Sequence, residues 1–575
     1  MAESVRGRSS PPWLGVALLA WPVLLAVALL WPLLAHGGHP LGRDLVFPPQ
    51  QPLTWSAAGL ADGSPRAVPL DAVVALLTTV IDGGALARIL LLAILVLAAA
   101  GVMRSLPWVG PVGLLVAAGV AVWNPFVVER LALGQWALLT SYAALPWLVR
   151  AAAASADRTP RRLGALAPVV GWAALASLTP TGGLLALAVV TVQVVLRRKA
   201  AAMQLLAVLL LQAPWVVAGL VGSSATVSDP AGVAAFAPDT EGRFGTLVAL
   251  LGLGGIWDAG SEPFSRTTVL APVTALAVVV VLVLAGRGLH RRLVAPVTWW
   301  VLGIGGLSYA LVLATGPGQA GLRVLVAHVP AAGLLRDAQK FLLPTALLVA
   351  LAAGVAADLL VRLLARRVPD AVEVRLVLMV PAIVAPLLLL PDGARLVWQT
   401  VDPVRFPESS YAEVDRITSG SGRAVAMLPW RAYRRFSWGH GLTSSDPATR
   451  VLRAPTVVSD DLQVGSRLVR GEGALAGQIG DILERGGDAR DLGALGIGWV
   501  VVYPDDPDAG TVDVDGLVPT YADSVLTLYA VPDSVPFAGP PLIARALLAA
   551  AYALVVVMLA AAVVRSSRQL RRQRR

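Results

Sequence analysis

The sequence predicts a polytopic α-helical membrane protein of about twelve spans, with one small α/β domain outside the membrane. Of its 575 residues, 56% are hydrophobic and 14% are charged, whereas a soluble domain carries about 25% charged residues. The mean hydropathy is +0.72, which favours a chain that lies mostly in lipid. The segment 392–541 alone has an ordinary soluble composition, so we expect it to form the exterior domain.

Twelve apolar runs are long enough, or nearly long enough, to cross a membrane. The first run, 13–35, would span about 35 Å as a helix, whereas the apolar part of a signal peptide has about 7–15 residues. We therefore predict an uncleaved first span. The runs are 13–35, 85–103, 108–123, 136–148, 165–178, 183–196, 200–221, 269–285, 293–314, 342–364, 376–390 and 542–564.

Basic clusters orient these spans. If the spans alternate from a cytoplasmic N-terminus, the basic clusters all fall on the cytoplasmic side, as the positive-inside rule requires. We therefore predict a multi-pass plasma-membrane protein with both termini cytoplasmic. The formal net charge of +10 follows from these loops and does not indicate a nucleic-acid partner. The clusters are Arg104, 150–163, 197–199, 286–292, 362–375 and 565–575.

Three parts follow from this topology: a membrane domain, an extracytoplasmic α/β domain, and a last span with its basic tail. β-branched runs at 422–430, 497–504 and 524–532 read as strands. The basic stretch 430–441 mixes Arg with Tyr and Trp, which suits sugar rings and phosphates or else forms a solvated loop. The parts are 1–391 with exterior loops 36–84, 223–266 and 315–341, then 392–541, then 542–575.

The first exterior loop contains "HPLGRDLVFPPQQPLTW", residues 39–55. Its one carboxylate, Asp44, is followed by a Pro-Pro pair that stiffens the chain and by Trp55, which suits the membrane interface. We interpret Asp44 as a carboxylate held at a cleft on the lipid side. The alternative is an ordinary loop acid that is hydrogen-bonded to its neighbours.

Two further stretches place charged or polar side chains at the outer surface. In "WNPFVVERLALGQW" (123–136), Glu129, Arg130 and Gln135 either belong to a site or form an interfacial belt. The loop 223–266 carries Asp239 among several acids, together with an apolar stretch that suits a re-entrant or interfacial helix.

A cationic cluster closes the exterior segment 316–341, where the positive-inside rule leaves it unexplained. Arg336 and Lys340 flank Asp337. Asp337 could pair with Lys340 at i,i+3, or the cations could hold an anionic phosphate. Both interpretations stay open.

Familiar hydrolase and nucleotide-binding motifs are absent from the sequence. It has no GxxxxGK[ST], HExxH or GxSxG motif and no cysteine. Ionisable residues are rare inside the spans. This pattern argues against an ion-coupled transporter, which retains such residues for coupling.

The layout resembles the GT-C glycosyltransferases, which use polyprenyl-phosphate-linked sugars as donors. Four stretches carry a narrower resemblance to actinobacterial membrane proteins related to arabinofuranosyltransferases and mannosyltransferases. They are "GRDLVFPP", "WNPFVVERLALGQWALL" with "YAALPW", "LRDAQKF", and "LGIGWVVVYPD" followed by "LTLYAVPD".

The resemblance implies an inverting transfer of a sugar from a polyprenyl-phosphate donor to a cell-envelope glycan or lipid acceptor on the outer face. Asp44 would be the general base, with Glu129 and Asp239 as second choices. The set expected to bind substrate or phosphate is Arg130, Gln135, Arg336, Lys340 and Trp55.

The cofactor is left open by the sequence. Many GT-C enzymes carry paired acids in the first loop, whereas here Asp44, Asp62, Asp71 and Asp82 stand apart. A divalent metal is therefore possible, but no paired-acid motif supports one. A non-catalytic scaffold for envelope assembly and a lipid or polysaccharide transporter remain as alternatives to the enzyme.

Overall fold

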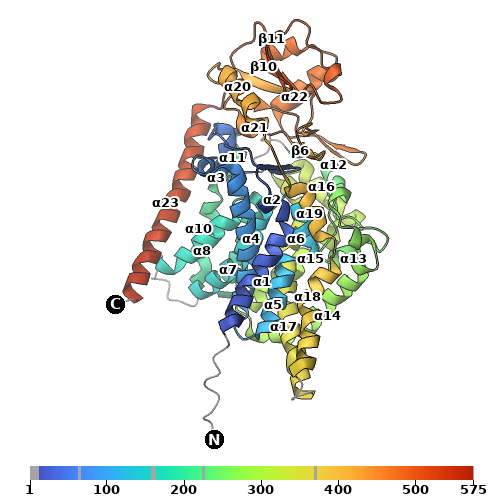
Figure 1. Ribbon diagram of the computed structural model, residues 1–575. Coiled ribbons are helices and arrows are strands. Elements are labelled where there is room, and N and C mark those ends of the chain that lie inside the picture. Colours follow the sequence, from blue (N-terminus) through green and yellow to red (C-terminus); the bar gives the residue numbers. More distant parts are fainter. Residues whose placement is uncertain are drawn as a thin grey trace.

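The computed structural model shows a bundle of helices with a small sheet domain at one end (Figure 1). The structure describes residues 12–62, 67–156, 163–197, 199–222, 227–367 and 372–573. Helix α1 begins, and α23 ends, at the end of the bundle opposite the sheet domain. The two ends of the helix bundle therefore differ. The sheet domain lies at one end, and the start of α1 and the end of α23 lie at the other.

Seven helices in the described ranges are long and apolar enough to cross a membrane, and the number rises to nine if two bent pairs each count as one span. Each of the twelve predicted runs contains a helix, but three of these helices are shorter than a span. The polytopic helical class is confirmed, and the count of twelve stays a prediction. The membrane-domain helices are α1 (Pro12–Leu29), α2 (Trp31–Ala35), α4 (Gly83–Ser105), α5 (Pro111–Val122), α6 (Pro125–Ala132), α7 (Trp136–Ala156), α8 (Ala167–Ala176), α9 (Pro180–Arg197), α10 (Lys199–Leu211), α11 (Ala213–Val221), α14 (Leu270–Arg292), α15 (Pro296–Leu313), α17 (Leu343–Arg367), α18 (Val372–Leu389), α19 (Gly393–Val401) and α23 (Leu542–Gln573).

The centre of the bundle is built on close contact between α5 and α17. A Cβ atom on Gly113 would lie 2.4 Å from the carbonyl oxygen of Gly354. Only glycine allows backbones to approach this closely, and such small residues are typical of helix interfaces in membranes. This packing holds α6, which follows α5 directly, in a fixed place beneath the exterior elements.

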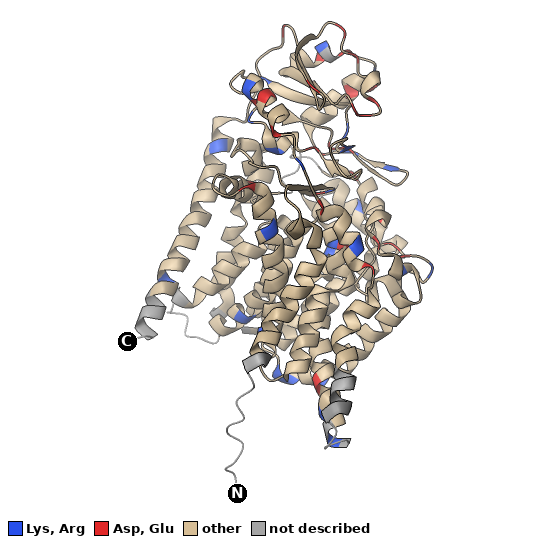
Figure 2. Ribbon diagram, viewed as in Figure 1, with Lys and Arg blue, Asp and Glu red and all other residues tan. Residues whose placement is uncertain are grey.

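Charged residues lie more at the ends of the bundle than along its middle (Figure 2). Parts of the basic clusters 150–163, 197–199, 362–375 and 565–575 lie outside the described residues. The predicted orientation of the termini therefore stays a prediction.

The exterior segments contain short elements. In the first loop, strands β1 (His39–Gly42) and β2 (Leu45–Val46) precede the short helix α3, and a three-stranded sheet in the order β2-β1-β3 ties this loop to the chain after α19. The remaining elements are η1 (Ser56–Leu60), α3 (Leu70–Thr78), α12 (Ala231–Ala235), α13 (Thr246–Leu251), η3 (Ala259–Ser261), η4 (Phe264–Thr267), α16 (Gly316–His328), η5 (Ala332–Leu335), η6 (Ala338–Leu342) and β3 (Pro403–Val404).

A five-stranded sheet in the order β11-β12-β10-β4-β7 organises the segment between α19 and α23. Its three strands β10, β4 and β7 run parallel, and β12 and β11 complete it in antiparallel fashion. The strands are β4 (Ala424–Leu428), β7 (Thr456–Val457), β10 (Ile497–Val502), β11 (Val518–Ala522) and β12 (Thr527–Ala530), and the helices beside them are α20 (Glu408–Thr418), α21 (Ala448–Val451), α22 (Ala474–Glu484), η7 (Ala489–Leu495) and η8 (Ala509–Thr511).

Two hairpins of this domain point back to the bundle. The first pairs β5 (Tyr433–Arg435) with β6 (Thr443–Ser445), and the second pairs β8 (Leu462–Val464) with β9 (Arg467–Val469). Ser445 donates its backbone N–H to the carbonyl oxygen of Arg43 at 2.9 Å. The first hairpin therefore docks on the loop that contains Asp44.

Candidate functional site

A cavity of about 920 Å³ lies where the exterior loops, the ends of the membrane helices and the sheet domain meet. Four of the residues that the sequence proposes for the site line this cavity: Asp44, Gln135, Arg336 and Lys340. They come from three separate segments of the chain. The fold therefore brings these four predicted residues to a common space, where further charged residues also line the wall.

Asp44 occupies the turn between β1 and β2, which rests on the end of α6. Its neighbour Arg43 has a φ of 54°, a left-handed conformation that is uncommon outside glycine. A Cβ atom on Gly134 would lie 2.5 Å from the backbone nitrogen of Leu45. Glycine at position 134 is therefore what lets the turn approach α6 and places the carboxylate at the cavity.

Two side chains donate hydrogen bonds to the Asp44 carboxylate. The Tyr433 hydroxyl donates to one oxygen, and Nε2 of Gln135 donates to the other at 3.4 Å. A carboxylate has about four lone-pair positions, so these bonds orient the group without saturating it. Asp44 therefore keeps hydrogen-bonding positions at the cavity that it lines.

Behind the cavity wall lies a buried cluster centred on Arg130. Its guanidinium donates to both carboxylate oxygens of Asp337, at 2.9 Å each, a bidentate geometry that arginine favours. It also donates to the side-chain oxygens of Gln135 and Gln339. Because Gln135 in turn contacts Asp44, the cluster holds the amide that orients the carboxylate.

Glu129 and Arg130 are both fully buried. Nε2 of Gln339 donates to Glu129 at 3.0 Å, so this acid belongs to the cluster. Neither residue lines the cavity. The interfacial-belt interpretation of these two residues is wrong, since α6 continues the preceding span and packs them inside the protein.

Asp337 carries the charge that balances Arg130. Burial raises the pKa of Asp337, but Arg130 and then Lys340 outweigh it and lower the pKa to about 2. Nζ of Lys340 lies 3.5 Å from the carboxylate. The local i,i+3 pair is therefore present, and Lys340 lines the cavity as well.

Arg336 is held from two sides. Its guanidinium lies 4.9 Å from the centre of the Phe236 ring and 3.8 Å from a carboxylate oxygen of Glu472. The side chain is only 9% exposed. It therefore reaches the cavity from a rigid position.

Asp239 lies away from this cavity. It is exposed, and its carboxylate accepts the backbone N–H of Thr240 at 2.6 Å. The nearby acid Glu262 has its pKa raised to about 7, by burial first and then by Glu241 and Asp239. The structure thus places Asp239 in an acidic group with Glu262 and Glu241, and Glu241 forms an ion pair with Arg266 at 2.9 Å.

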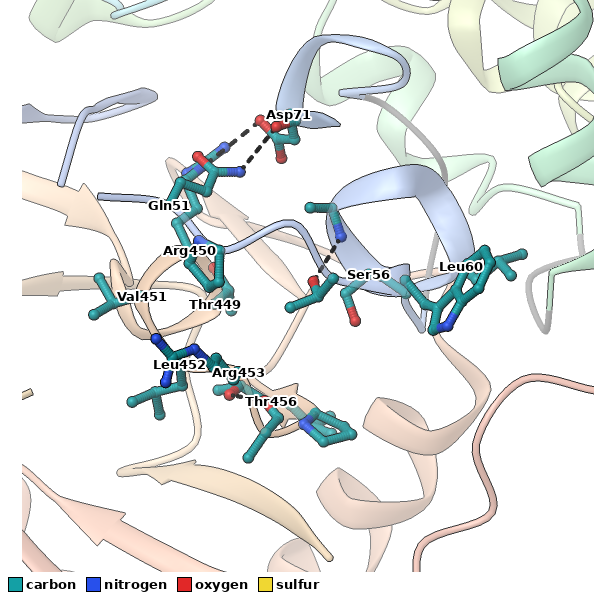
Figure 3. Close-up of a pocket in the computed structure, with 18 of the residues that line it drawn as sticks. Gln51, Ser56, Leu60, Asp71, Thr449, Arg450, Val451, Leu452, Arg453 and Thr456 are labelled. Carbon is teal, nitrogen blue, oxygen red and sulfur yellow. Dashed lines mark hydrogen bonds and ion pairs between the residues drawn. The ribbon is translucent and has the colours of Figure 1, made fainter. Parts of the chain in front are cut away.

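Trp55 lines a second, larger cavity of about 1640 Å³. Figure 3 shows Gln51, Asp71 and Arg450 together on one side of it, with Ser56 and Leu60 on another. The guanidinium of Arg545 lies 5.8 Å from the centre of the Trp55 ring. Trp55 and Asp44 therefore come from one loop but face different cavities.

Within the described ranges, no group of three or more His, Asp or Glu side chains is arranged to hold a metal ion.

Comparison with known proteins reveals likeness only at the level of three-dimensional structure. No protein-family model matches the chain, and no curated protein matches it. The solved structure of the arabinofuranosyltransferase AftD from mycobacteria aligns with a TM-score of 0.55 at 16% identity, over 91% of this chain. A mutant of the same protein aligns with a TM-score of 0.52 at 17% identity, over 91% of this chain. The chain therefore shares the fold of AftD over most of its length.

This shared fold confirms the predicted resemblance at the level of architecture. The chain spans 40% of the length of AftD and 42% of the mutant structure. ArnT from Cupriavidus metallidurans, solved with undecaprenyl phosphate, matches at 12% identity and a TM-score of 0.42, over 92% of this chain and 100% of its own.

Two contacts of the site were not predictable from the sequence. Tyr433 lies in the basic and aromatic stretch 430–441, whose composition indicated sugar or phosphate binding, but no local signal linked it to Asp44. The sequence suggests Lys340 as the partner of Asp337. The shorter contact of Asp337 is with Arg130, 207 positions away. Both contacts depend on the docking of distant segments.

Proposed function

We propose that the chain is an integral-membrane glycosyltransferase that moves a sugar from a polyprenyl-phosphate donor to a cell-envelope glycan or lipid acceptor. One observation carries this proposal: Asp44, Arg336 and Lys340 line the same cavity. A base and a pair of cations in one space are what the transfer requires. The GT-C fold supports the same class of reaction.

Asp44 acts as the general base in this proposal. An acceptor hydroxyl attacks the anomeric carbon of the donor sugar, and its proton passes to the Asp44 carboxylate. A new bond forms between the acceptor oxygen and the anomeric carbon as the bond from that carbon to the phosphate oxygen breaks. A single displacement of this kind inverts the anomeric centre, by analogy with inverting hydrolysis. Tyr433 and Gln135 hold the carboxylate in position throughout.

The leaving polyprenyl phosphate keeps the bonding electrons and its negative charge. Lys340, with 26% of its side chain exposed, is the more accessible cation, and Arg336 lies behind it at 9%. Cations placed where charge develops stabilise the transition state without reorganisation. Arg130 contributes indirectly, because it forms the bidentate pair with Asp337, the carboxylate that Lys340 also contacts at 3.5 Å.

The reaction is proposed to occur at the outer face of the plasma membrane, with both termini cytoplasmic. The chain has no cysteine, so single cysteines report location cleanly. A membrane-impermeant maleimide should label Ser524→Cys, in the turn between β11 and β12, in intact cells. It should label Ser567→Cys, near the end of α23, only after the cells are permeabilised. Labelling of both in intact cells would contradict this orientation.

Asp44→Asn tests the function directly. The purified wild-type protein is assayed with decaprenyl-phosphate-linked arabinofuranose and mannose and with octyl glycosides as acceptors. Loss of a general base typically costs about 10²–10⁴-fold in rate, so transfer should fall by at least about 100-fold while membrane insertion stays normal. Asp481→Asn, an exposed change on α22, is the matched control.

The alternatives give different results in the same experiments. Transfer that survives Asp44→Asn would show that this residue is not the base. A scaffold would form no glycosidic bond in the wild type and would tolerate the substitution. A transporter would move a labelled lipid-linked sugar between leaflets of a vesicle without transferring it.

A further inference from the structure

The two cavities meet at a single ion pair. Nε of Arg450 lies 3.7 Å from a carboxylate oxygen of Asp71, and both residues line both cavities. Asp71 lies in the first turn of α3, and Arg450 lies on the short helix α21. Gln51 and Ser445 are the other residues common to the two linings. The boundary is therefore made jointly by the first exterior loop and the sheet domain.

The larger cavity has the size and lining of a site for an extended polar ligand. Its volume of about 1640 Å³ exceeds the 300–1,000 Å³ that is typical of small-molecule sites (about one drug-sized ligand). Its wall combines an aromatic ring, Trp55, with the amides Gln50 and Gln51 and with side chains of both charges. Aromatic faces and amide groups suit the rings and hydroxyls of sugars. Its charged residues are five acids and three arginines, and this excess of acids suits a neutral glycan more than an anion.

The boundary is connected to Asp44 through the backbone. The first loop leaves β2 and reaches Gln51 five residues after Val46. On the other side, Ser445 donates its N–H to the carbonyl oxygen of Arg43 at 2.9 Å. Arg450 follows Ser445 by five positions. Because Asp71 and Arg450 line the same cavity as Asp44, a ligand held at the boundary would reach the space that the carboxylate faces.

We propose that the larger cavity binds the acceptor glycan, and that Asp71 and Arg450 position its reacting end at the boundary between the two cavities. This inference rests on the proposed function. The ion pair is long and its side chains are 23% and 21% exposed, so both groups keep free hydrogen-bonding positions. A carboxylate offers about four acceptor positions and a guanidinium five N–H donors. Sugar hydroxyls can use both, and the donor occupies the smaller cavity with Lys340 and Arg336.

Asp71→Asn and Arg450→Gln are the first test. With the donor and octyl glycoside that the wild type accepts, each variant should raise the acceptor KM by about fivefold or more, since each removes a charged hydrogen-bonding partner. The donor KM should stay within about twofold. Arg416→Gln, in an exposed pair with Glu413 outside both cavities, is the matched control. Equal changes in both KM values, or no change in either, would overturn the assignment.

A label in the larger cavity is the second test, and it does not depend on the ion-pair variants folding. Ser56→Cys, on η1, is modified with a bulky maleimide, and Ser524→Cys is modified as the control. The label at position 56 should raise the acceptor KM by about fivefold or more and leave the donor KM within about twofold. An unchanged acceptor KM would place the acceptor elsewhere. A wild type that transfers no sugar would instead contradict the proposed function itself.

Discussion

The hydroxyl of Tyr433 donates a hydrogen bond to the carboxylate of Asp44, across 389 positions of the chain. One residue belongs to the sheet domain and the other to the first exterior loop. The sheet domain therefore contributes a side chain to the cavity that the membrane helices and the first loop also line.

Tyr433→Phe should weaken catalysis without abolishing it. The change removes one hydrogen bond to a charged group, which is worth about 1.5–3 kcal/mol, while Gln135 still contacts the carboxylate. We expect kcat to fall by about tenfold or more and the substrate KM values to change little. Steady-state kinetics check this. A kcat equal to that of the wild type would show that Tyr433 does not position Asp44 during the reaction.

Arg130→Met should destabilise the protein strongly. It leaves the carboxylate of Asp337 buried without its bidentate partner, a loss that costs about 3–5 kcal/mol for buried pairs. The apparent Tm in detergent should drop, and adding Asp337→Asn should restore part of it. Arg416→Gln, at an exposed pair, should leave the Tm unchanged. If the double variant were no more stable than Arg130→Met, the pairing would not explain the loss.

Lys340 and Arg336 should differ in what they contribute. Lys340 is the more exposed cation, so Lys340→Gln should raise the donor KM by about tenfold with little change in Tm. Arg336 also packs on Phe236 and pairs with Glu472, so Arg336→Gln should lower the Tm as well. Kinetics and thermal unfolding on the same preparations separate the two effects. A Lys340→Gln protein with a normal donor KM would argue against phosphate binding at this position.

Glu262 should make stability fall as the pH rises. Its pKa in the folded protein is raised from 4.5 to about 7, so the folded state binds its proton more tightly than the unfolded state. Stability therefore decreases between pH 4.5 and 7. Glu262→Gln should reduce this decrease in Tm, whereas Glu484→Gln, at an exposed site on α22, should not. An identical Tm profile in wild type and Glu262→Gln would contradict the raised pKa.

Much of the membrane domain follows from local sequence. The run 85–103 lies within α4, and 542–564 lies within α23, because a segment in lipid must satisfy its backbone internally and expose apolar side chains. Composition and spacing are enough to find such helices. The strand at 497–504 was also visible as a β-branched run, and it forms β10.

Interfaces between distant segments were not visible in the same way. Arg130 reads as a surface cation because it stands next to polar residues and a turn. It is buried because α5 and α6 continue as one span and Asp337 approaches from 207 positions away. Asp239 and Asp44 look alike in sequence, yet only Asp44 lines the cavity.

Sequence alone determined that this is a helical membrane protein with long loops between some of its helices, and it selected Asp44, Gln135, Arg336 and Lys340 as residues of interest. Hydropathy and short motifs are local properties of the chain, so they can be recognised without knowledge of the fold. Tertiary structure alone decided that these four residues share a cavity, that Arg130 supports them from behind, and that Trp55 faces a different space. Those relationships depend on side-chain packing between segments hundreds of residues apart, for which a single sequence carries no local signal.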